Sequence, residues 1–371
     1  MKVASDPAVA SAVAAGRVPA DVSIAHLDET RDLPAKIAII FVCSLAFIII
    51  VLRCFSRIFL VKIFFGIDDV LAIISWMFHI SFAALSIVLI DLGSGRHYDY
   101  IIYVMPLNTV KKTETLDFIA HLLYTTALFA CRCSGLAFYY RLCDRQRGFR
   151  ILILCAGIFL VCAYLPQMFL IIFHCLPVTS LWPYDWQPGA SDYTCLQWGT
   201  VYSVNSSFSL ICDLVIFTIP VLIIRSLHLS LKRKFQISLV LLPGVLVISI
   251  SIARLYLVAI GQWLADESWS YDPLLAVENA EIAATIIALS VPALKPLLGK
   301  WASIFTAVFK GDEDSDGAKC GRGIGYRLRS LSKNSGLVPS KRKSSAPAHA
   351  IPERPKKPGS NGSDGSLLRP Q

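Results

Sequence analysis

The sequence predicts an all-α membrane protein in which seven helices cross the bilayer as one bundle. The 371 residues are 55% hydrophobic and only 16% charged, which is too apolar for a soluble domain of this size. The apolar residues come in long blocks, and a hydrocarbon core about 30 Å thick needs roughly 20 helical residues to cross it. Because the blocks show no period-two alternation, we expect helices and not a transmembrane barrel.

Seven blocks are long enough to cross the bilayer in this way. In chain order, the expected transmembrane helices cover residues 37–58, 68–92, 114–141, 151–176, 197–224, 236–260 and 275–299. Proline lies inside several of them, which predicts kinks or frayed ends that neighbouring helices tolerate in lipid. The expected organisation is therefore an extracellular N-terminal tail at 1–36 and a membrane domain at 37–299.

Lys and Arg residues in the short connections predict the orientation of the bundle. The connections after helices 1, 3, 5 and 7 carry thirteen of them, whereas the other face carries five. Because short basic loops remain in the cytosol, we expect the N-terminus outside and the C-terminus in the cytosol. We expect a multi-pass protein of the plasma membrane.

The C-terminal region is expected to be cytosolic. Residues 300–310 read KWASIFTAVFK, whose apolar positions recur at helical spacing, so they form either a short helix on the inner leaflet or the frayed end of helix 7. Residues 311–371 are rich in Lys, Arg, Ser, Gly and Pro, which predicts a disordered basic tail. That tail contacts anionic lipid or, with the inner loops, a cytosolic transducer, or it is only a solvated extension. We expect no nucleic-acid partner, since the positive charge belongs to the tail and not to the bundle.

Two of the eleven cysteines differ from the rest in their position. Most cysteines lie inside the predicted helices, where a free thiol acts as a small apolar group. Cys175 and Cys195 instead frame an outer segment, and the oxidising exterior permits them to bridge. We expect a disulfide between them.

Ionisable residues inside the predicted helices are candidates for function, because a charge at membrane depth is costly unless it is paired or hydrated. At about 1.5 Å per residue, Arg132 and Asp213 lie at matched depth in helices 3 and 5. Arg254 and Glu281 lie at matched depth in helices 6 and 7. We expect two buried ion pairs, the alternative being that each charge reaches water separately.

Asp68 and Asp69 begin helix 2 at its cytosolic end. Carboxylates are favoured there because the unpaired N–H groups and the helix dipole are positive. One aspartate suffices for this role, so the second is expected to face the bundle and hold Arg141 or another inner basic residue as a cytosolic latch. The alternative is a direct role in proton transfer or ligand binding.

Polar residues also converge in the outer half of the predicted bundle, among helices 3, 6 and 7 and the loop between the two cysteines. This set is a candidate ligand pocket, because small-molecule sites combine aromatic walls with a few polar groups. Its polar members are Glu114, Asp117, His121 and Glu278 near Arg254 and Glu281, and its aromatic members are Trp182, Trp186 and Trp198.

Short motifs follow one another in a characteristic order from the start of the second predicted helix to the seventh. They are Asp68 and Asp69; Gly93, Gly95 and His97 in GSGRH; Tyr124, Ser134, Phe138, Tyr139 and Arg141; Cys175, Pro177, Trp182 and Cys195; and Asn205, Asp213, Pro220, Arg254 and Glu281. Over residues 37–299 the chain resembles the fungal rhodopsin-like seven-helix family, the receptor-like integral membrane proteins of filamentous fungi. Arg132 replaces the lysine that is usual in this family.

The resemblance implies a receptor-like protein, but it does not imply a pigment. Retinal needs a Schiff-base lysine in the middle of helix 7, and that stretch here reads AATIIAL. We therefore expect no chromophore, cofactor or metal, no enzymatic activity, and an unknown extracellular or membrane-borne small ligand. The alternatives are a secondary transporter or proton-coupled permease that uses the buried charges and, with less support, a membrane-embedded hydrolase.

Overall fold

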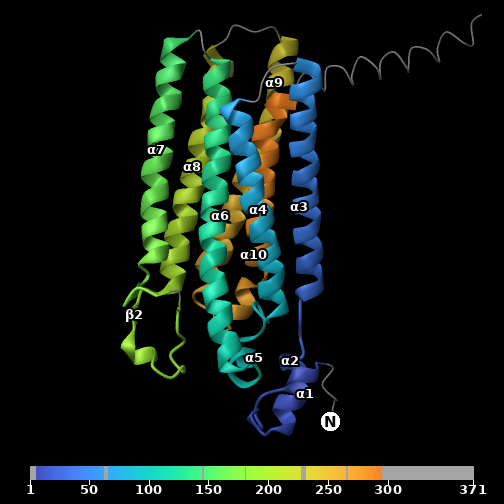
Figure 1. The fold of residues 1–371 in the computed structure, drawn as a ribbon, viewed down its shortest axis with the longest axis vertical. Helices are drawn as coiled ribbons and strands as arrows, with labels where there is room; N and C mark the ends of the chain where they lie inside the picture. Colours follow the sequence, from blue (N-terminus) through green and yellow to red (C-terminus); the bar gives the residue numbers. More distant parts are fainter. Residues whose placement is uncertain are drawn as a thin grey trace, which may run out of the picture. The chain divides into compact units, whose positions relative to one another are not determined.

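The computed structural model describes residues 6–61, 66–143, 146–179, 181–226, 231–264 and 266–294. Within these ranges, seven helices are long and apolar enough to cross a membrane. They lie side by side as a bundle (Figure 1), which confirms the predicted fold class. The predicted inner-leaflet helix and the predicted basic tail lie outside the described residues.

The seven long helices follow the predicted order along the chain. They are α3 (Asp32–Phe55), α4 (Ile67–Asp91), α6 (Leu107–Leu142), α7 (Arg147–Ile172), α8 (Trp198–Ser226), α9 (Leu231–Gly261) and α10 (Glu267–Ser290). A π-helical segment, Ser56–Val61, continues α3, and a 3-10 turn, Val291–Leu294, continues α10. Both α6 and α10 begin several residues before their predicted starts, because their first turns carry polar residues that lower the local hydropathy.

Helix α10 is the central element of the bundle. It packs against α3, α4, α6 and α9, and 72% of its membrane-spanning stretch is buried, compared with 22% for the peripheral helices α3 and α7. Figure 1 shows α10 behind α4 and α6. The outward faces of the peripheral helices are apolar, as lipid requires: Phe41 on α3 is 66% exposed and Ile151 on α7 is 65% exposed.

Short elements gather at one end of the bundle, which we call the disulfide end; the other is the far end. Strands β1 (Cys175–Leu176) and β2 (Thr194–Cys195) pair there, and the disulfide between Cys175 and Cys195 confirms the expected bridge. Helices α1 (Pro7–Ala14), α2 (Ile24–Leu27) and α5 (Tyr98–Tyr103) lie at the same end (Figure 1).

The N-terminal segment contains two short helices, α1 and α2, that pack against α5. Val9, Ala12 and Leu27 are fully buried and share one small apolar cluster with Tyr100 and Ile101 of α5. Because neither helix is long or strongly amphipathic, these contacts with α5, and not local preference, hold the segment in place. Residues 6–31 therefore form a folded cap on the disulfide end.

The GSGRH motif forms the turn between α4 and α5. Gly93 and Gly95 have φ angles of 98° and 86°, in the left-handed region that side chains other than glycine rarely adopt. This turn places the side chain of His97 beside the start of α10, where its Nδ1 lies 2.5 Å from Asp266 Oδ2. The motif thus places a histidine where the turn between α4 and α5 meets the start of α10.

Candidate functional site

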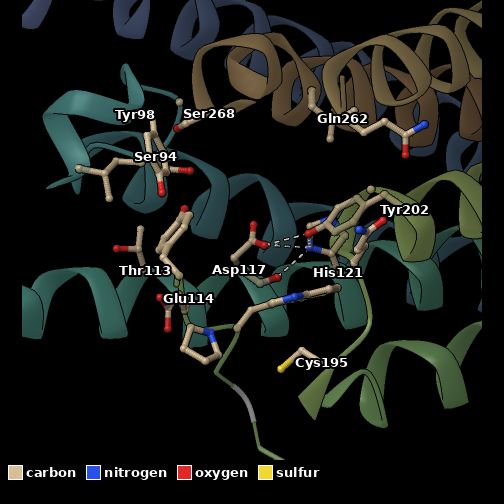
Figure 2. A pocket seen from close by; sticks show the side chains of 18 of the residues that line it. Ser94, Tyr98, Thr113, Glu114, Asp117, His121, Cys195, Tyr202, Gln262 and Ser268 are labelled. Carbon is tan, nitrogen blue, oxygen red and sulfur yellow. Dashed lines mark hydrogen bonds and ion pairs between the residues drawn. The ribbon is translucent and has the colours of Figure 1, made fainter. Parts of the chain in front are cut away.

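A cavity of about 1000 Å³ opens at the disulfide end of the bundle. It is lined by the GSGRH turn, α6, the loop between the cysteines, the start of α8 and the facing ends of α9 and α10. All five residues of the predicted ligand pocket line it: Glu114, Asp117, His121, Trp182 and Glu278. Figure 2 shows the side chains of Glu114, Asp117 and His121 on one face of α6, directed towards this space.

Asp117, His121 and Tyr202 form the polar centre of the cavity wall (Figure 2). The Tyr202 hydroxyl donates to Asp117 Oδ2 at 2.9 Å and lies 3.1 Å from His121 Nδ1. On the other side of the imidazole ring, His121 Nε2 lies 3.7 Å from Glu278 Oε1. Helical spacing explains the first part of this arrangement, because positions i and i+4 share one face of α6.

The charge of the cavity wall is strongly one-sided. Among the described residues that line it, the acidic side chains are Glu114, Asp117, Asp185 and Glu278, and there is no Lys or Arg. Aromatic rings make up much of the remaining wall: Tyr98, Trp182, Tyr184, Tyr202 and Trp263. Carboxylates and aromatic faces both attract cations.

The other two tryptophans that were predicted for the ligand pocket are not part of the described cavity wall. Trp186 lies outside the cavity lining and packs against the buried cluster of the N-terminal cap. The side chain of Trp198 is outside the described part of the chain. Trp186 was misplaced because the loop between the cysteines folds towards α5, which its sequence alone does not indicate.

Arg254 lies next to the cavity, between two carboxylates of α10. Its Nε is 2.9 Å from Glu281 Oε2, and its Nη1 is 3.9 Å from Glu278 Oε1. Nε and Nη2 are buried and lack a partner with hydrogen-bond geometry, so the attraction is that of an ion pair rather than of a bidentate hydrogen bond. The guanidinium also lies over the Tyr124 ring, 5.0 Å from its centroid.

Glu281 is the centre of a hydrogen-bond network in the middle of the bundle. The Tyr124 hydroxyl donates to its Oε2 at 2.7 Å, and the hydroxyls of Ser209 and Ser251 lie 3.2 Å and 3.0 Å from its Oε1. Glu281 is fully buried. A carboxylate in this position is stabilised only because several donors and one guanidinium surround it.

The second predicted pair joins the same network. Arg132 Nε donates to Asp213 Oδ1 at 2.9 Å, and Arg132 Nη2 donates to Ser209 Oγ at 2.6 Å. Ser251 Oγ lies 2.9 Å from Asp213 Oδ2. The two pairs expected from matched depth are therefore parts of one network, which we call the central network: Tyr124, Arg132, Ser209, Asp213, Ser251, Arg254 and Glu281.

A second group of charges closes the far end. Arg53 Nε donates to Asp69 Oδ1 at 2.9 Å and its Nη2 donates to Asp68 Oδ2 at 3.1 Å. Arg57 Nη2 donates to Asp68 Oδ2 at 2.7 Å. The predicted partner Arg141 also reaches Asp68, at 3.5 Å, but its side chain is 39% exposed.

The two aspartates divide the expected roles less strictly than the sequence suggests. Asp69 combines the two functions that were assigned to separate residues, because its Oδ2 accepts from the Gly66 N–H at 3.4 Å while its Oδ1 binds Arg53. Arg53 and Arg57 are inner basic residues of the kind expected beside Arg141, and both are buried in the continuous helical segment. Their i, i+4 spacing is the signal that could have placed both on the face towards Asp68 and Asp69.

Helix α10 contacts all three groups along its length. Glu278 lines the cavity, Glu281 centres the central network, and Ser290 accepts a hydrogen bond from Arg53 Nη1 at 3.4 Å. At about 1.5 Å per residue, Glu278 and Ser290 are roughly 18 Å apart along the helix axis. Among the described residues, no hydrogen bond or ion pair joins the central network directly to Asp68 and Asp69.

Comparison with known proteins agrees with this architecture. A model of the fungal rhodopsin domain matches residues 52–300. A SAT4 family membrane protein of Emericella nidulans is 24% identical over 216 residues, which cover 58% of this chain and 52% of that protein. The chain thus spans about half the length of this curated relative, and no solved structure matches the chain.

The matched region begins in α3 and extends past the end of α10, so it contains the cavity, the central network and the charges of the far end. It also covers more than half of the chain. The chain belongs to the fungal rhodopsin family of multi-pass membrane proteins.

Proposed function

We propose that this protein is a receptor-like sensor that binds a small organic cation in the cavity at the disulfide end. The observation that carries the proposal is the connection of a carboxylate-lined cavity to a buried charge network through one shared side chain, Arg254. We place the disulfide end outside the plasma membrane, because a disulfide persists in an oxidising compartment and the basic connections lie at the other end. We assign no catalytic role to these residues.

The balance of buried charge supports a cationic ligand. Arg132 and Arg254 formally supply two positive charges, whereas Asp213, Glu278 and Glu281 supply three negative ones, and all five side chains are buried. His121, whose Nε2 lies 3.7 Å from Glu278 Oε1, adds a positive charge only when it is protonated. Beside a neutral imidazole, one carboxylate exceeds the number of cationic partners. Because an uncompensated charge at this depth costs several kilocalories per mole, a cation beside Glu278 would complete the balance.

Arg254 offers a way to transmit binding to the rest of the bundle. Arg254 faces both Glu278 and Glu281. A cation that neutralises Glu278 removes one of these attractions, so Arg254 is held by Glu281 alone and the contact between α9 and α10 changes. A ligand can shift an equilibrium only through such a difference in interaction energy between two states.

The far-end group is the expected site of the response. Arg53 binds Asp68, Asp69 and Ser290 of α10 together, and its contact with Ser290 is long at 3.4 Å. A displacement of α10 would break this contact first. We propose that opening of the latch formed by Arg53, Asp68 and Asp69 exposes the far end to a cytosolic transducer.

Ligand-dependent stability of the purified protein tests the binding step. In lipid nanodiscs, a panel of organic ammonium compounds should contain members that raise the melting temperature in wild type, whereas carboxylates of matched size should not. The variant Glu278→Gln should lose the shift. Asp192→Asn is the matched control. Asp192 is an exposed carboxylate in the loop between Cys175 and Cys195, and it does not line the cavity.

Liposome flux separates the sensor from the transporter alternative. A transporter would use the cavity and central network as a path, and its reconstituted form should move the stabilising cation or protons across the bilayer. Binding without flux would support the sensor, and flux that Glu278→Gln abolishes would replace it.

A further inference from the structure

A second cluster of ionisable side chains lies at the rim of the cavity. It consists of His26 of α2, His97 of the GSGRH turn and Asp266, which precedes α10. One nitrogen or oxygen atom from each residue lies within 4.8 Å of the other two. The sequence does not predict this cluster, because its members come from three distant segments; His97 and Asp266 are 169 residues apart.

Asp266 connects the other two members. Its Oδ2 lies 2.5 Å from His97 Nδ1 and 3.9 Å from His26 Nε2. Its Oδ1 accepts from the backbone N–H of Tyr98 at 2.9 Å, which fixes the orientation of the carboxylate. One carboxylate oxygen is thus directed at two imidazole rings.

Further carboxylates surround this cluster. Glu29 Oε2 lies 3.6 Å from His97 Nε2, which is buried and has no hydrogen-bond partner. Asp99 Oδ2 lies 4.0 Å from His26 Nε2. Three carboxylates therefore face two histidines, an excess of negative charge that suits a divalent cation.

We infer that His26, His97 and Asp266 form a binding site for a zinc ion, which ties the N-terminal cap to the rim of the cavity. A donor set of two imidazole nitrogens and one carboxylate oxygen binds zinc in preference to magnesium or calcium. In this arrangement the donors are His26 Nε2, His97 Nδ1 and Asp266 Oδ2. Asp99 or water supplies the fourth ligand.

Small movements suffice to reach coordination geometry. Tetrahedral donors about 2.0–2.1 Å from zinc are separated from one another by about 3.3 Å. The contact between His97 and Asp266 must therefore widen by about 0.8 Å, and the separation of His26 from Asp266 must shorten by about 0.6 Å. Both changes are below 1 Å, and the separation of the two imidazole nitrogens, which is at most 4.8 Å, must shorten by up to about 1.5 Å.

The environments of the two histidines permit these movements. The His97 ring stacks on Trp269 with 3.9 Å between centroids and 15° between planes, so its orientation is fixed. The His26 ring lies 3.7 Å from His97 at 34°, and its side chain is 41% exposed, so it has room to turn its Nε2 towards the ion. Glu29 would then accept from His97 Nε2 and fix the tautomer, as carboxylates do beside zinc-bound histidines.

The site would couple the cap to the cavity. Gly95 and Tyr98 flank His97, Ser268 follows Asp266 closely, and all three line the cavity. His26 belongs to the N-terminal segment that covers this end. A bound zinc ion would therefore hold three segments of the cavity rim in one arrangement.

Zinc titration of the full-length protein in nanodiscs tests the inference. After chelation and dialysis, isothermal titration with zinc chloride should show one site per chain, and magnesium chloride should show none. His26→Ala and Asp266→Asn should each weaken zinc binding by at least the roughly 10- to 100-fold that loss of an outer-shell partner costs. Asn keeps the helix-capping ability of Asp266, and Asp21→Asn, an exposed change on the N-terminal segment, should leave zinc affinity unchanged.

X-ray absorption of the zinc-loaded wild type supplies evidence that does not depend on the folding of any variant. The inference predicts a zinc ion with two imidazole ligands and oxygen ligands, and a coordination shell without imidazole would overturn it. It would also be overturned if zinc affinity were unchanged in both His26→Ala and Asp266→Asn, or were lost in His121→Gln, which would place the ion in the cavity. Each experiment measures zinc binding itself, so its result tests the zinc site independently of the proposed cation sensor.

Discussion

Removing Arg254 should destabilise the protein more than removing either of its carboxylate partners. Arg254→Met keeps a long apolar side chain but leaves the carboxylates of Glu278 and Glu281 buried without their shared guanidinium. Removing one partner of a buried ion pair costs about 3–5 kcal/mol. We therefore expect Arg254→Met to lower the free energy of unfolding by about that amount.

The two carboxylate variants should cost less, and by different amounts. Glu281→Gln leaves Arg254 facing Glu278 but weakens hydrogen bonds from Tyr124 and two serines, so a loss of about 1–3 kcal/mol is expected. Glu278→Gln should have the smallest effect, because it removes the excess negative charge and leaves the closer pair of Arg254 and Glu281 intact. The expected order of destabilisation is Arg254→Met, then Glu281→Gln, then Glu278→Gln.

Equilibrium unfolding in mixed micelles measures these differences, with wild type and the exposed-site variant Asp192→Asn as references. The double variant Arg254→Met, Glu281→Gln should lose less than the sum of the single variants, by about 0.5–3 kcal/mol. If Arg254→Met is no more costly than Glu278→Gln, Arg254 is not the residue shared by both carboxylates. If the effects of Arg254→Met and Glu281→Gln simply add, those two side chains do not interact.

Three further changes test the packing of the bundle. Gly135→Val should destabilise by about 1–3 kcal/mol, because a Cβ there would lie 2.8 Å from Leu289 Cδ2; adding Leu289→Ala should restore part of the loss, and thermal unfolding that ignores the second change would contradict this contact. Replacing Cys175 and Cys195 by Ser opens a bridge between residues 20 apart and should cost about 3 kcal/mol, whereas equal melting of the variant and wild type under non-reducing conditions would not fit. Gly66→Ala would bring a methyl group against the Asp68 carboxylate and the Arg141 guanidinium, so the melting temperature of this variant should fall, and an unchanged value would show that the latch can rearrange freely.

Hydropathy was sufficient to predict the seven spans, but not all of their ends. The first turns of α6 and α10 were missed because Lys111, Lys112 and Asp272 resemble connecting segments when only local composition is counted. The structure shows that both helices continue past the apolar stretch and form the cavity wall. A helix end that lines a binding site carries polar residues. Because those residues lower the local hydropathy, a hydropathy search misses that end of the helix.

Charge and depth in the membrane predicted the ion pairs of the candidate site, but not the other contacts that connect them. Matched depth predicted a pair of Arg254 and Glu281, because an ionised group in lipid requires a partner, and the two side chains lie 2.9 Å apart. It did not predict that Ser209 and Ser251 join this pair to Asp213, since serine occurs at any depth without penalty. It also could not bring together His26 and Asp266, because contacts between distant connecting segments depend on the folded cap.

Hydrogen exchange at the far end of the Glu278→Gln variant tests the central claim most directly. This substitution neutralises the cavity carboxylate in the way a bound cation would, so no ligand needs to be known. If Glu278 is coupled through α10 to the latch, peptides covering residues 66–72 should exchange faster in Glu278→Gln than in wild type, while Asp192→Asn should match wild type. Equal exchange of these peptides in all three proteins would contradict coupling between the cavity and the far end.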